Sequence, residues 1–175
     1  VNVPALITGA WGDLFHIGSI RSFQGMQTQS SSEASRKGTM LVMTGGGGHG
    51  REGVLSFGNA GDQNIRELQL RFYDYHLKGI RNGIDREPRV QLFVQVPPDA
   101  GVQGSGFWVS DDSFPLAGTE HVRFSLSSGG RANTRWGDGV LKRNEPSHGE
   151  GDVFVYDPNR PAPALGGGLC CLTLG

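Results

Sequence analysis

"VPALITGAWGDLF", residues 3–15, begins as an unbroken apolar run and ends beside an acidic residue, Asp13. The run contains β-branched residues and does not alternate with polar ones, which predicts a strand covered on both faces, as in a parallel sheet. Asp13 comes a few residues after the predicted strand. An aspartate at such a place can form a turn, cap a following helix or serve as a functional carboxylate.

A second buried strand is predicted at residues 39–44, "TMLVMT". Between the two strands, Ile17, Ile20 and Phe23 recur at helical spacing and predict a helix, which a polar, serine-rich loop at residues 27–38 follows. Strand, helix and strand in this order predict the right-handed crossover unit of an α/β fold.

A further helix is predicted from about residue 62 to Leu77, because apolar side chains again share one face. Asp62 or Asn64 can cap its first turn. Gly79 suits the left-handed residue that follows the end of many helices.

The remaining sequence contains short, alternating strand patterns separated by turn residues. They lie at residues 89–96, 121–128, 152–158 and 168–174. Short strands spaced by turns predict a β-sandwich of the jelly-roll kind, and the last pattern runs to the end of the chain, so we expect that sandwich to be incomplete. The composition changes near residues 82–88, which places the predicted domain boundary between residues 1–84 and 85–175.

The charge pattern favours a small molecule or a protein surface as the partner. The chain has 16 Lys and Arg and 17 Asp and Glu residues, and the basic ones are scattered instead of gathered in a stripe. This distribution argues against binding of nucleic acid or a membrane surface. No apolar stretch approaches the roughly 20 residues that cross a bilayer, so we expect a soluble chain.

The sequence leaves the compartment open. Val1 stands in a predicted strand, so a signal peptide could precede it. Cys170 and Cys171 are neighbours and could pair only as a strained vicinal disulfide, so we interpret them as small buried side chains.

Two residues that suit acid–base chemistry follow the two predicted parallel strands. Asp13 follows the first strand, and His49 follows the second after four glycines. Functional groups in open α/β sheets gather beyond the carboxyl ends of the strands, so we expect both side chains in one crevice. An aspartate that accepts the Nδ1 proton of a histidine fixes its tautomer and stabilises the imidazolium, which makes this pair two members of a catalytic triad.

The third member of such a triad, a nucleophile, has no candidate in this chain. In α/β-hydrolases the order is nucleophile, acid, histidine, and the nucleophile lies on a G-x-S-x-G turn. Ser56, Ser105 and Ser147 all lack that context. The sequence therefore predicts a nucleophilic serine upstream of Val1.

Several segments in order carry a resemblance to a known family. They are "VPALITGAWGDLF" (3–15), "LVMTGGGGHG" (41–50), "LRFYDYHLKGIRNG" (70–83), "EPRVQLFV" (87–94) and "VYDPNRPAPALGGGLCC" (155–171). Together they are similar to the C-terminal part of the family of cocaine esterases, α-amino-acid ester hydrolases and X-prolyl dipeptidyl aminopeptidases. That resemblance implies an α/β-hydrolase domain followed by a jelly roll, and a serine hydrolase that cleaves esters or amides.

The resemblance also implies roles for individual residues. Asp13 corresponds to the triad acid of a G-W-x-D-x-F segment, and His49 to the histidine of a G-P-W-x-H-G segment. Gly12 stands where the family commonly has an aromatic residue, and Gly46 and Gly47 stand where it has Pro and Trp. We therefore expect His49 to be held less firmly than in relatives, and we expect this chain alone to be inactive.

Other interpretations of these residues stay open at this point. The glycine run could bind phosphate as a nest of backbone N–H groups, although it lacks the Lys and Ser/Thr of a P-loop. His16 lies three residues after Asp13, but a third metal ligand is missing, and we expect neither metal nor cofactor.

The β-rich half has its own alternatives. His148, Glu150 and Asp152 alternate and could form a calcium loop or a polar strand edge. Trp108 and Trp136 could stack against sugars or anchor a core. The competing function is therefore a non-catalytic β-sandwich that binds a ligand or protein; whether the full-length protein forms homo-oligomers is left open.

Overall fold

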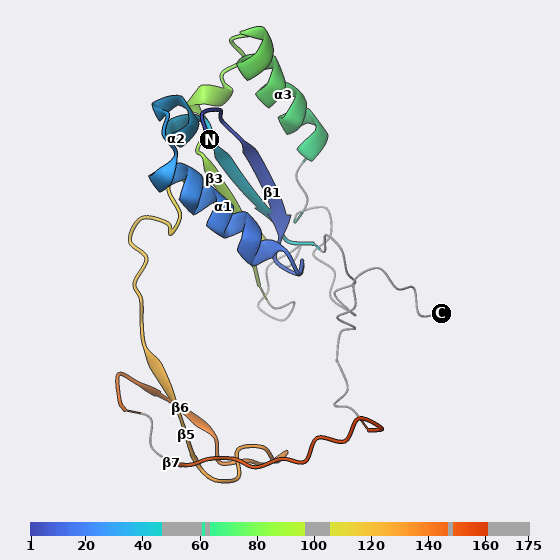
Figure 1. Cartoon of the computed structure of the whole chain (residues 1–175), viewed down its shortest axis with the longest axis vertical. Helices are drawn as coiled ribbons and strands as arrows, with labels where there is room; N and C mark the ends of the chain where they lie inside the picture. The colour runs from blue at the N-terminus through green and yellow to red at the C-terminus, as the bar shows by residue number, and fades with distance from the viewer. Residues whose placement is uncertain (47–60, 62–63, 97–105, 147–148, 161–175) are drawn as a thin grey trace. The chain divides into compact units, whose positions relative to one another are not determined.

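The computed structural model describes residues 1–46, 61, 64–96, 106–146 and 149–160 (Figure 1). The chain divides into two compact units, the first reaching from Val1 to Ala117 and the second beginning at Gly118. Each is described by itself below.

The first unit is built on a four-stranded sheet with the order β1-β2-β3-β4. Its strands are β1 (Leu6–Ala10), β2 (Met40–Thr44), β3 (Val90–Gln95) and β4 (Gly106–Asp111). β1, β2 and β3 run parallel, and β4 pairs antiparallel with β3. Its helices are α1 (His16–Gln29), α2 (Glu33–Gly38), α3 (Ile65–Lys78) and the short 3₁₀ turn η2 (Ile84–Arg86). The predicted α/β crossover is thus present.

Helices cover both faces of this sheet around β2. Leu41 and Met43 pack with Phe23 of α1, whereas Val42 packs with Phe72 of α3. Successive side chains of a strand point to opposite faces, so α1 and α3 lie on opposite sides. This double cover explains why β2 is an unbroken apolar run.

The ends of α3 follow the sequence prediction. The Asn64 side chain accepts a hydrogen bond from the Glu67 N–H, and Gly79 adopts a left-handed conformation with φ 70°.

The serine-rich loop predicted at residues 27–38 is wrong in part. α1 continues to Gln29, and α2 forms because the Ser32 hydroxyl caps the Ser35 N–H.

The alternating pattern of residues 89–96 predicts a strand of the β-rich half, but β3 belongs to the sheet of the first unit. Leu41 and Met43 of β2 stand opposite Val90 and Leu92 of β3. Phe93, on the other face, is also fully buried and contacts Trp108 with ring centroids 5.5 Å apart. The predicted division after residue 84 therefore falls between β2 and β3, which belong to one sheet. A boundary between two evolutionary domains at this position stays a proposal.

The second unit has a smaller sheet with the order β6-β5-β7. Its strands are β5 (Phe124–Gly129), β6 (Val140–Arg143) and β7 (Gly149–Glu150). β5 pairs antiparallel with β6 and parallel with β7. A β-rich second part is thus present.

The strand predicted at residues 152–158 is wrong. The structure gives these residues no strand, and the side chains of Val153 to Tyr156 are all strongly exposed. An alternating pattern forms a strand only where a neighbouring strand accepts its backbone hydrogen bonds. The strand predicted at residues 168–174, with Cys170 and Cys171, lies outside the described residues.

Candidate functional site at the carboxyl ends of β1 and β2

The backbone brings the ends of two strands to one edge of the sheet. β1 and β2 pair in parallel from Leu6 opposite Met40 to Ala10 opposite Thr44. The pairing continues one step further, because the Trp11 N–H donates to the Thr44 carbonyl at 3.2 Å. The segments that follow both strands therefore start side by side.

Asp13 lies in a tight turn directly after β1 and is buried, with 8% of its surface exposed. Its N–H donates to the Ala10 carbonyl at 3.1 Å, and its Oδ1 accepts the Phe15 N–H at 2.8 Å. The turn-forming role considered for Asp13 is therefore real. The helix-capping role is wrong, because α1 has Phe15 at its N-cap position.

The first residue of α1 folds back onto the same turn. The His16 N–H and Nδ1 lie 3.1 and 2.7 Å from the Asp13 carbonyl oxygen. Two groups thus fix the peptide that follows Asp13, and a carboxylate needs such a fixed backbone if it is to orient a second group.

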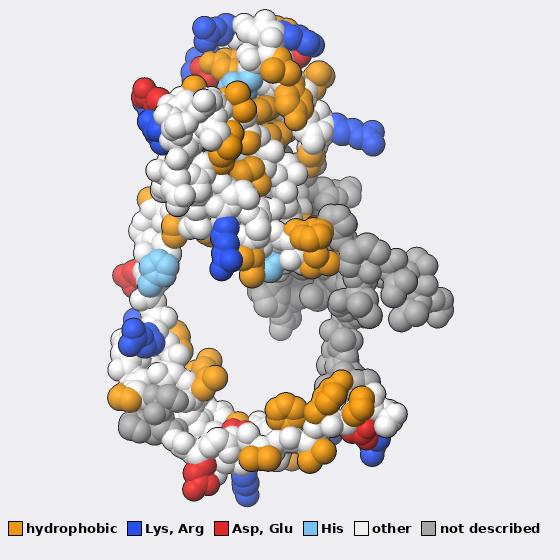
Figure 2. All heavy atoms as spheres, viewed as in Figure 1, with side chains coloured by type: hydrophobic (Ala, Val, Ile, Leu, Met, Phe, Trp, Pro, Cys, Tyr) orange, Lys and Arg blue, Asp and Glu red, His pale blue; other side chains and the backbone are white. Residues whose placement is uncertain are grey.

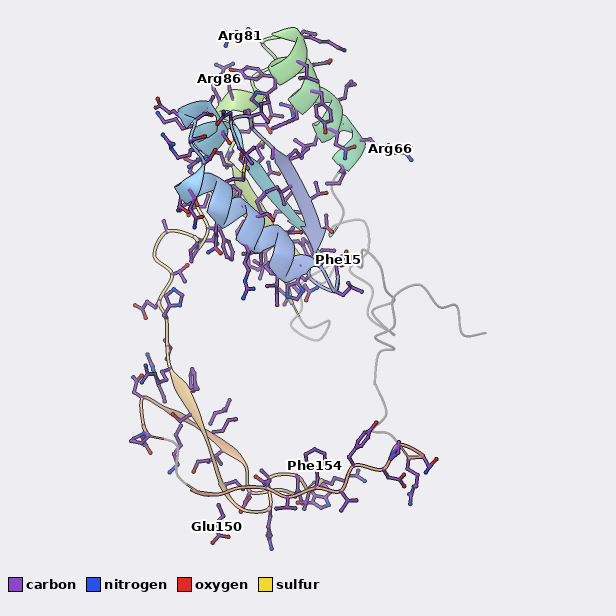
Figure 3. All side chains as sticks on the ribbon, in the orientation of Figure 1. Phe15, Arg66, Arg81, Arg86, Glu150 and Phe154 are labelled. Carbon is purple, nitrogen blue, oxygen red and sulfur yellow. The ribbon has the colours of Figure 1, made fainter. Side chains whose placement is uncertain are left out.

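Three apolar side chains that follow Asp13 in the sequence are exposed. Leu14, Phe15 and Ile17 are each more than half exposed. Figure 3 labels Phe15 at the start of α1, beside the end of β1. A buried aspartate thus lies next in sequence to exposed apolar side chains.

His49 lies outside the described residues, so its placement beside Asp13 stays a prediction. The segment that leads to it is described as far as Gly46. Gly45 directly follows β2, and its N–H donates to the Gly61 carbonyl at 2.9 Å. Ser56, Ser105 and Ser147 also lie outside the described residues.

Two residues at this edge have roles that the sequence did not predict. The Trp11 indole Nε1–H donates to the Phe93 carbonyl at 2.6 Å, and the Gln95 side chain Nε2 donates to the Gly45 carbonyl at 3.0 Å. Their partners are 82 and 50 residues away along the chain. No local pattern signals such contacts, because they arise only once β3 joins β2.

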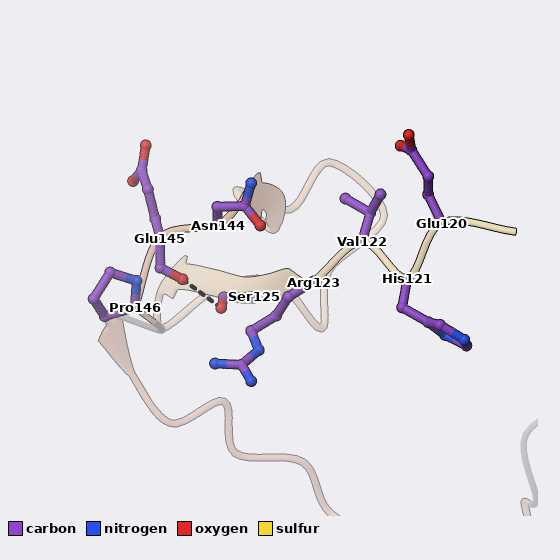
Figure 4. A pocket seen from close by; sticks show the side chains of 8 residues that line it. All are labelled: Glu120, His121, Val122, Arg123, Ser125, Asn144, Glu145 and Pro146. Atoms are coloured by element: carbon purple, nitrogen blue, oxygen red, sulfur yellow. Dashed lines mark hydrogen bonds between the residues drawn. The ribbon is translucent and has the colours of Figure 1, made fainter. Parts of the chain in front are cut away.

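The second unit contains a groove of its own (Figure 4). It is lined by Glu120, His121, Val122, Arg123, Ser125, Asn144, Glu145 and Pro146. The Ser125 hydroxyl donates to the Glu145 carbonyl at 2.5 Å. This bond occupies the one hydroxyl proton of Ser125.

Two carboxylates away from the turn have structural roles. The backbone N–H groups of Ala117 and Asp112 hold the pKa of Asp111 below its usual value. The Ser128 hydroxyl, followed by the Gly129 N–H, lowers the pKa of Asp138. Both carboxylates stabilise turns by accepting hydrogen bonds, which favours their ionised form.

The two tryptophans lie in different surroundings, and the sugar-stacking interpretation stays a prediction. Trp108 packs against the cluster of Val42 and Phe72, so it anchors a core. Trp136 is 83% exposed, and the Arg135 guanidinium lies 5.3 Å from its ring centroid.

The described ranges also bear on metal binding and membrane insertion. Within them, no cluster of three or more His, Cys, Asp or Glu side chains is arranged to hold a metal ion. His148, one of the three residues considered for a calcium loop, lies outside these ranges. The described helices include none that is long and apolar enough to span a membrane.

The chain is similar to parts of known proteins. Residues 82–166 match the family described as the X-Pro dipeptidyl-peptidase C-terminal non-catalytic domain. A cocaine esterase from Rhodococcus sp. (strain MB1 Bresler) is 31% identical over 173 residues, which cover 95% of this chain and 27% of that protein. The chain thus spans about a quarter of the length of the curated relative that it matches.

Two crystal structures of a CocE/NonD family hydrolase from Staphylococcus aureus also overlay on the chain. Their TM-scores are 0.45 and 0.47, and their identities are 22% and 21%. The overlays cover 70% and 76% of this chain and 18% and 20% of those structures.

Proposed function

Because the chain belongs to the family of cocaine esterase-like and X-Pro dipeptidyl-peptidase-like hydrolases, of which it represents the C-terminal part, we propose that it supplies two members of a Ser-His-Asp triad. Asp13 is the acid and His49 is the base. The serine belongs to a part of the full-length protein upstream of Val1. The proposed reaction is cleavage of an ester or amide bond in a small molecule.

The proposed chemistry has two steps. His49 takes the proton of the serine hydroxyl as the serine oxygen attacks the carbonyl carbon, and it then gives that proton to the departing alcohol or amine. Water next attacks the acyl-enzyme, with His49 again taking and returning a proton. Asp13 keeps the imidazole in one tautomer and stabilises its protonated form.

The observation that carries this proposal is the parallel pairing of β1 and β2. Asp13 follows Ala10 by three residues, His49 follows Thr44 by five, and Ala10 and Thr44 stand opposite each other. Groups that follow adjacent parallel strands share the crevice at the carboxyl edge of a sheet. The burial of Asp13 and its fixed backbone also support a positioned carboxylate.

The finer fold is part of the same proposal. Residues 1–84 would form the C-terminal part of an α/β-hydrolase domain, and residues 85–175 part of a jelly roll. The match of residues 82–166 to a C-terminal non-catalytic domain supports a boundary near this position. β3 would then belong to the second evolutionary domain while completing the sheet of the first.

The proposal is tested on the full-length protein with a fluorophosphonate probe, which labels a serine only when a base activates it. We expect labelling in the wild type and in His121→Ala, a control histidine of the second unit, and loss of labelling in His49→Ala. Labelling of His49→Ala at the wild-type rate would contradict the proposal.

A second candidate function applies to residues 82–166, which match a domain described as non-catalytic. These residues would then bind a ligand or protein without chemistry. Full-length protein that hydrolyses no p-nitrophenyl ester and takes up no probe would favour this candidate.

A further inference from the structure

The turn that carries Asp13 is held from across the sheet by a tryptophan. Trp11 lies two residues before Asp13, and its indole Nε1–H donates to the Phe93 carbonyl at 2.6 Å. Its backbone N–H donates to Thr44 at 3.2 Å. Trp11 therefore connects the end of β1 to both β2 and β3.

A second contact from β3 holds the segment after β2. The Gln95 side chain donates to the Gly45 carbonyl at 3.0 Å. The Phe93 ring lies against Gly45 so closely that a Cβ at this position would stand 2.4 Å from the ring. Only glycine leaves room for that approach, so β3 fixes the position of Gly45.

Both contacts start from the same short strand. Phe93 contributes its carbonyl and its ring, and Gln95 contributes its amide, two residues along. β3 lies within residues 82–166, the part that matches a non-catalytic domain. This strand thus touches the beginnings of both segments that carry the proposed acid and base.

We propose that β3 positions the catalytic acid of this protein. The Trp11 indole connects Phe93 to the Asp13 turn, and the Gln95 side chain holds Gly45 at the end of β2. This inference rests on the proposed function. Trp11 acts through the turn that carries Asp13, and Gln95 acts through the backbone at Gly45, so both are positioning residues. A domain described as non-catalytic then has a direct part in the geometry of catalysis.

The physical reason is the precision that a triad needs. An aspartate orients a histidine only if its carboxylate is held within a fraction of an ångström. The parallel pairing with β2 is one anchor for the end of β1. The indole bond to Phe93 adds a second anchor, one strand further into the sheet.

The test uses the full-length protein and the variant Trp11→Phe, which keeps an aromatic ring and removes the donor. We expect kcat for a p-nitrophenyl ester to fall by about 10- to 100-fold while KM changes less than about twofold, as for loss of positioning. The acid limb of the kcat/KM profile should move to lower pH, because a displaced Asp13 stabilises the imidazolium less. Trp136→Phe, which removes an exposed indole of the second unit, should retain wild-type kinetics.

A double-mutant cycle separates positioning from a general effect on folding. In an Asp13→Asn background, Trp11→Phe should lower kcat by less than about twofold, because the group that it positions is already lost. Gln95→Leu offers a second variant in case Trp11→Phe does not fold, with an expected loss in kcat of about 3- to 10-fold. Its control is Gln27→Leu, which removes another amide that donates to a backbone carbonyl.

The outcomes distinguish this inference from the proposed function. Wild-type kcat in Trp11→Phe and Gln95→Leu, together with an inactive Asp13→Asn, would overturn the positioning role and leave the triad standing. A full further loss of kcat from Trp11→Phe in the Asp13→Asn background would also overturn it. An active Asp13→Asn would overturn the triad itself and this inference with it.

Discussion

The sheet of the first unit and the sheet of the second differ in what covers them. β2 has four fully or almost fully buried apolar residues between α1 and α3. In β5 and β6, the apolar side chains of Phe124, Leu126, Val140 and Leu141 are all more than half exposed. Figure 2 shows apolar side chains in orange on the surface of the second unit.

The difference teaches where a rigid site can form. Asp13, Trp11 and Gly45 directly follow strands of the covered sheet. Close packing of that sheet fixes the backbone at these residues. In the second unit most side chains that line the groove are exposed, and Phe154 extends from a segment without regular structure (Figure 3). The contrast predicts that equal substitutions have unequal effects in the two units.

The largest difference in stability is expected between two leucines on strands. Leu41 of β2 is fully buried, so Leu41→Ala should lower the free energy of unfolding by about 2–5 kcal/mol. Leu141 of β6 is 65% exposed, so Leu141→Ala should change it by no more than about 0.5 kcal/mol. Urea denaturation of the 175-residue chain measures both, and equal losses would remove the basis of the comparison.

A smaller difference is expected between two glycines. A Cβ at Gly45 would meet the Phe93 ring at 2.4 Å, so Gly45→Ala should destabilise the protein by about 1–3 kcal/mol through overpacking. A Cβ at Gly151 meets nothing within 4 Å, so Gly151→Ala should be neutral within about 0.5 kcal/mol. Urea denaturation measures both changes in the free energy of unfolding. No loss of stability in Gly45→Ala would show that the Phe93 ring can move aside.

The smallest effect concerns the dependence of stability on pH. Burial lowers the pKa of His76 from 6.5, and the nearby charge of Asp85 opposes this shift. The unfolded chain binds the proton more readily, so stability should be fully present above pH 6.5 and fall as the pH drops through the lower folded-state pKa. His76→Gln should flatten that part of the profile. An unchanged profile in the variant would mean that burial of His76 does not affect folding.

Much of the first unit could be predicted from the sequence, because its signals are local. The apolar runs of β1 and β2, the Asn64 cap and the left-handed Gly79 each depend on residues close in sequence. The position of Asp13 after β1 follows from the same local pattern, and its burial is observed in the structure.

The rest depends on contacts between distant residues. β3 has an alternating pattern typical of a sandwich, yet it pairs with β2, about 50 residues earlier. Trp11 has no signal for its bond to Phe93, because the acceptor is a backbone carbonyl that every residue has. Residues 152–158 alternate like a strand, but an isolated strand cannot satisfy its backbone groups.

Each unit contains an aspartate whose substitution tests the proposed triad. The most direct measurement is kcat for ester hydrolysis by the full-length protein with Asp13→Asn or Asp152→Asn. Asp13 is buried in the turn after β1, whereas Asp152 belongs to the exposed second unit and accepts the Asn133 N–H at 3.3 Å. We predict that Asp13→Asn lowers kcat by about 10⁴-fold, as loss of the triad acid does, and that Asp152→Asn leaves it within about twofold. A kcat for Asp13→Asn within tenfold of the wild type would contradict the assignment of Asp13 as the catalytic acid.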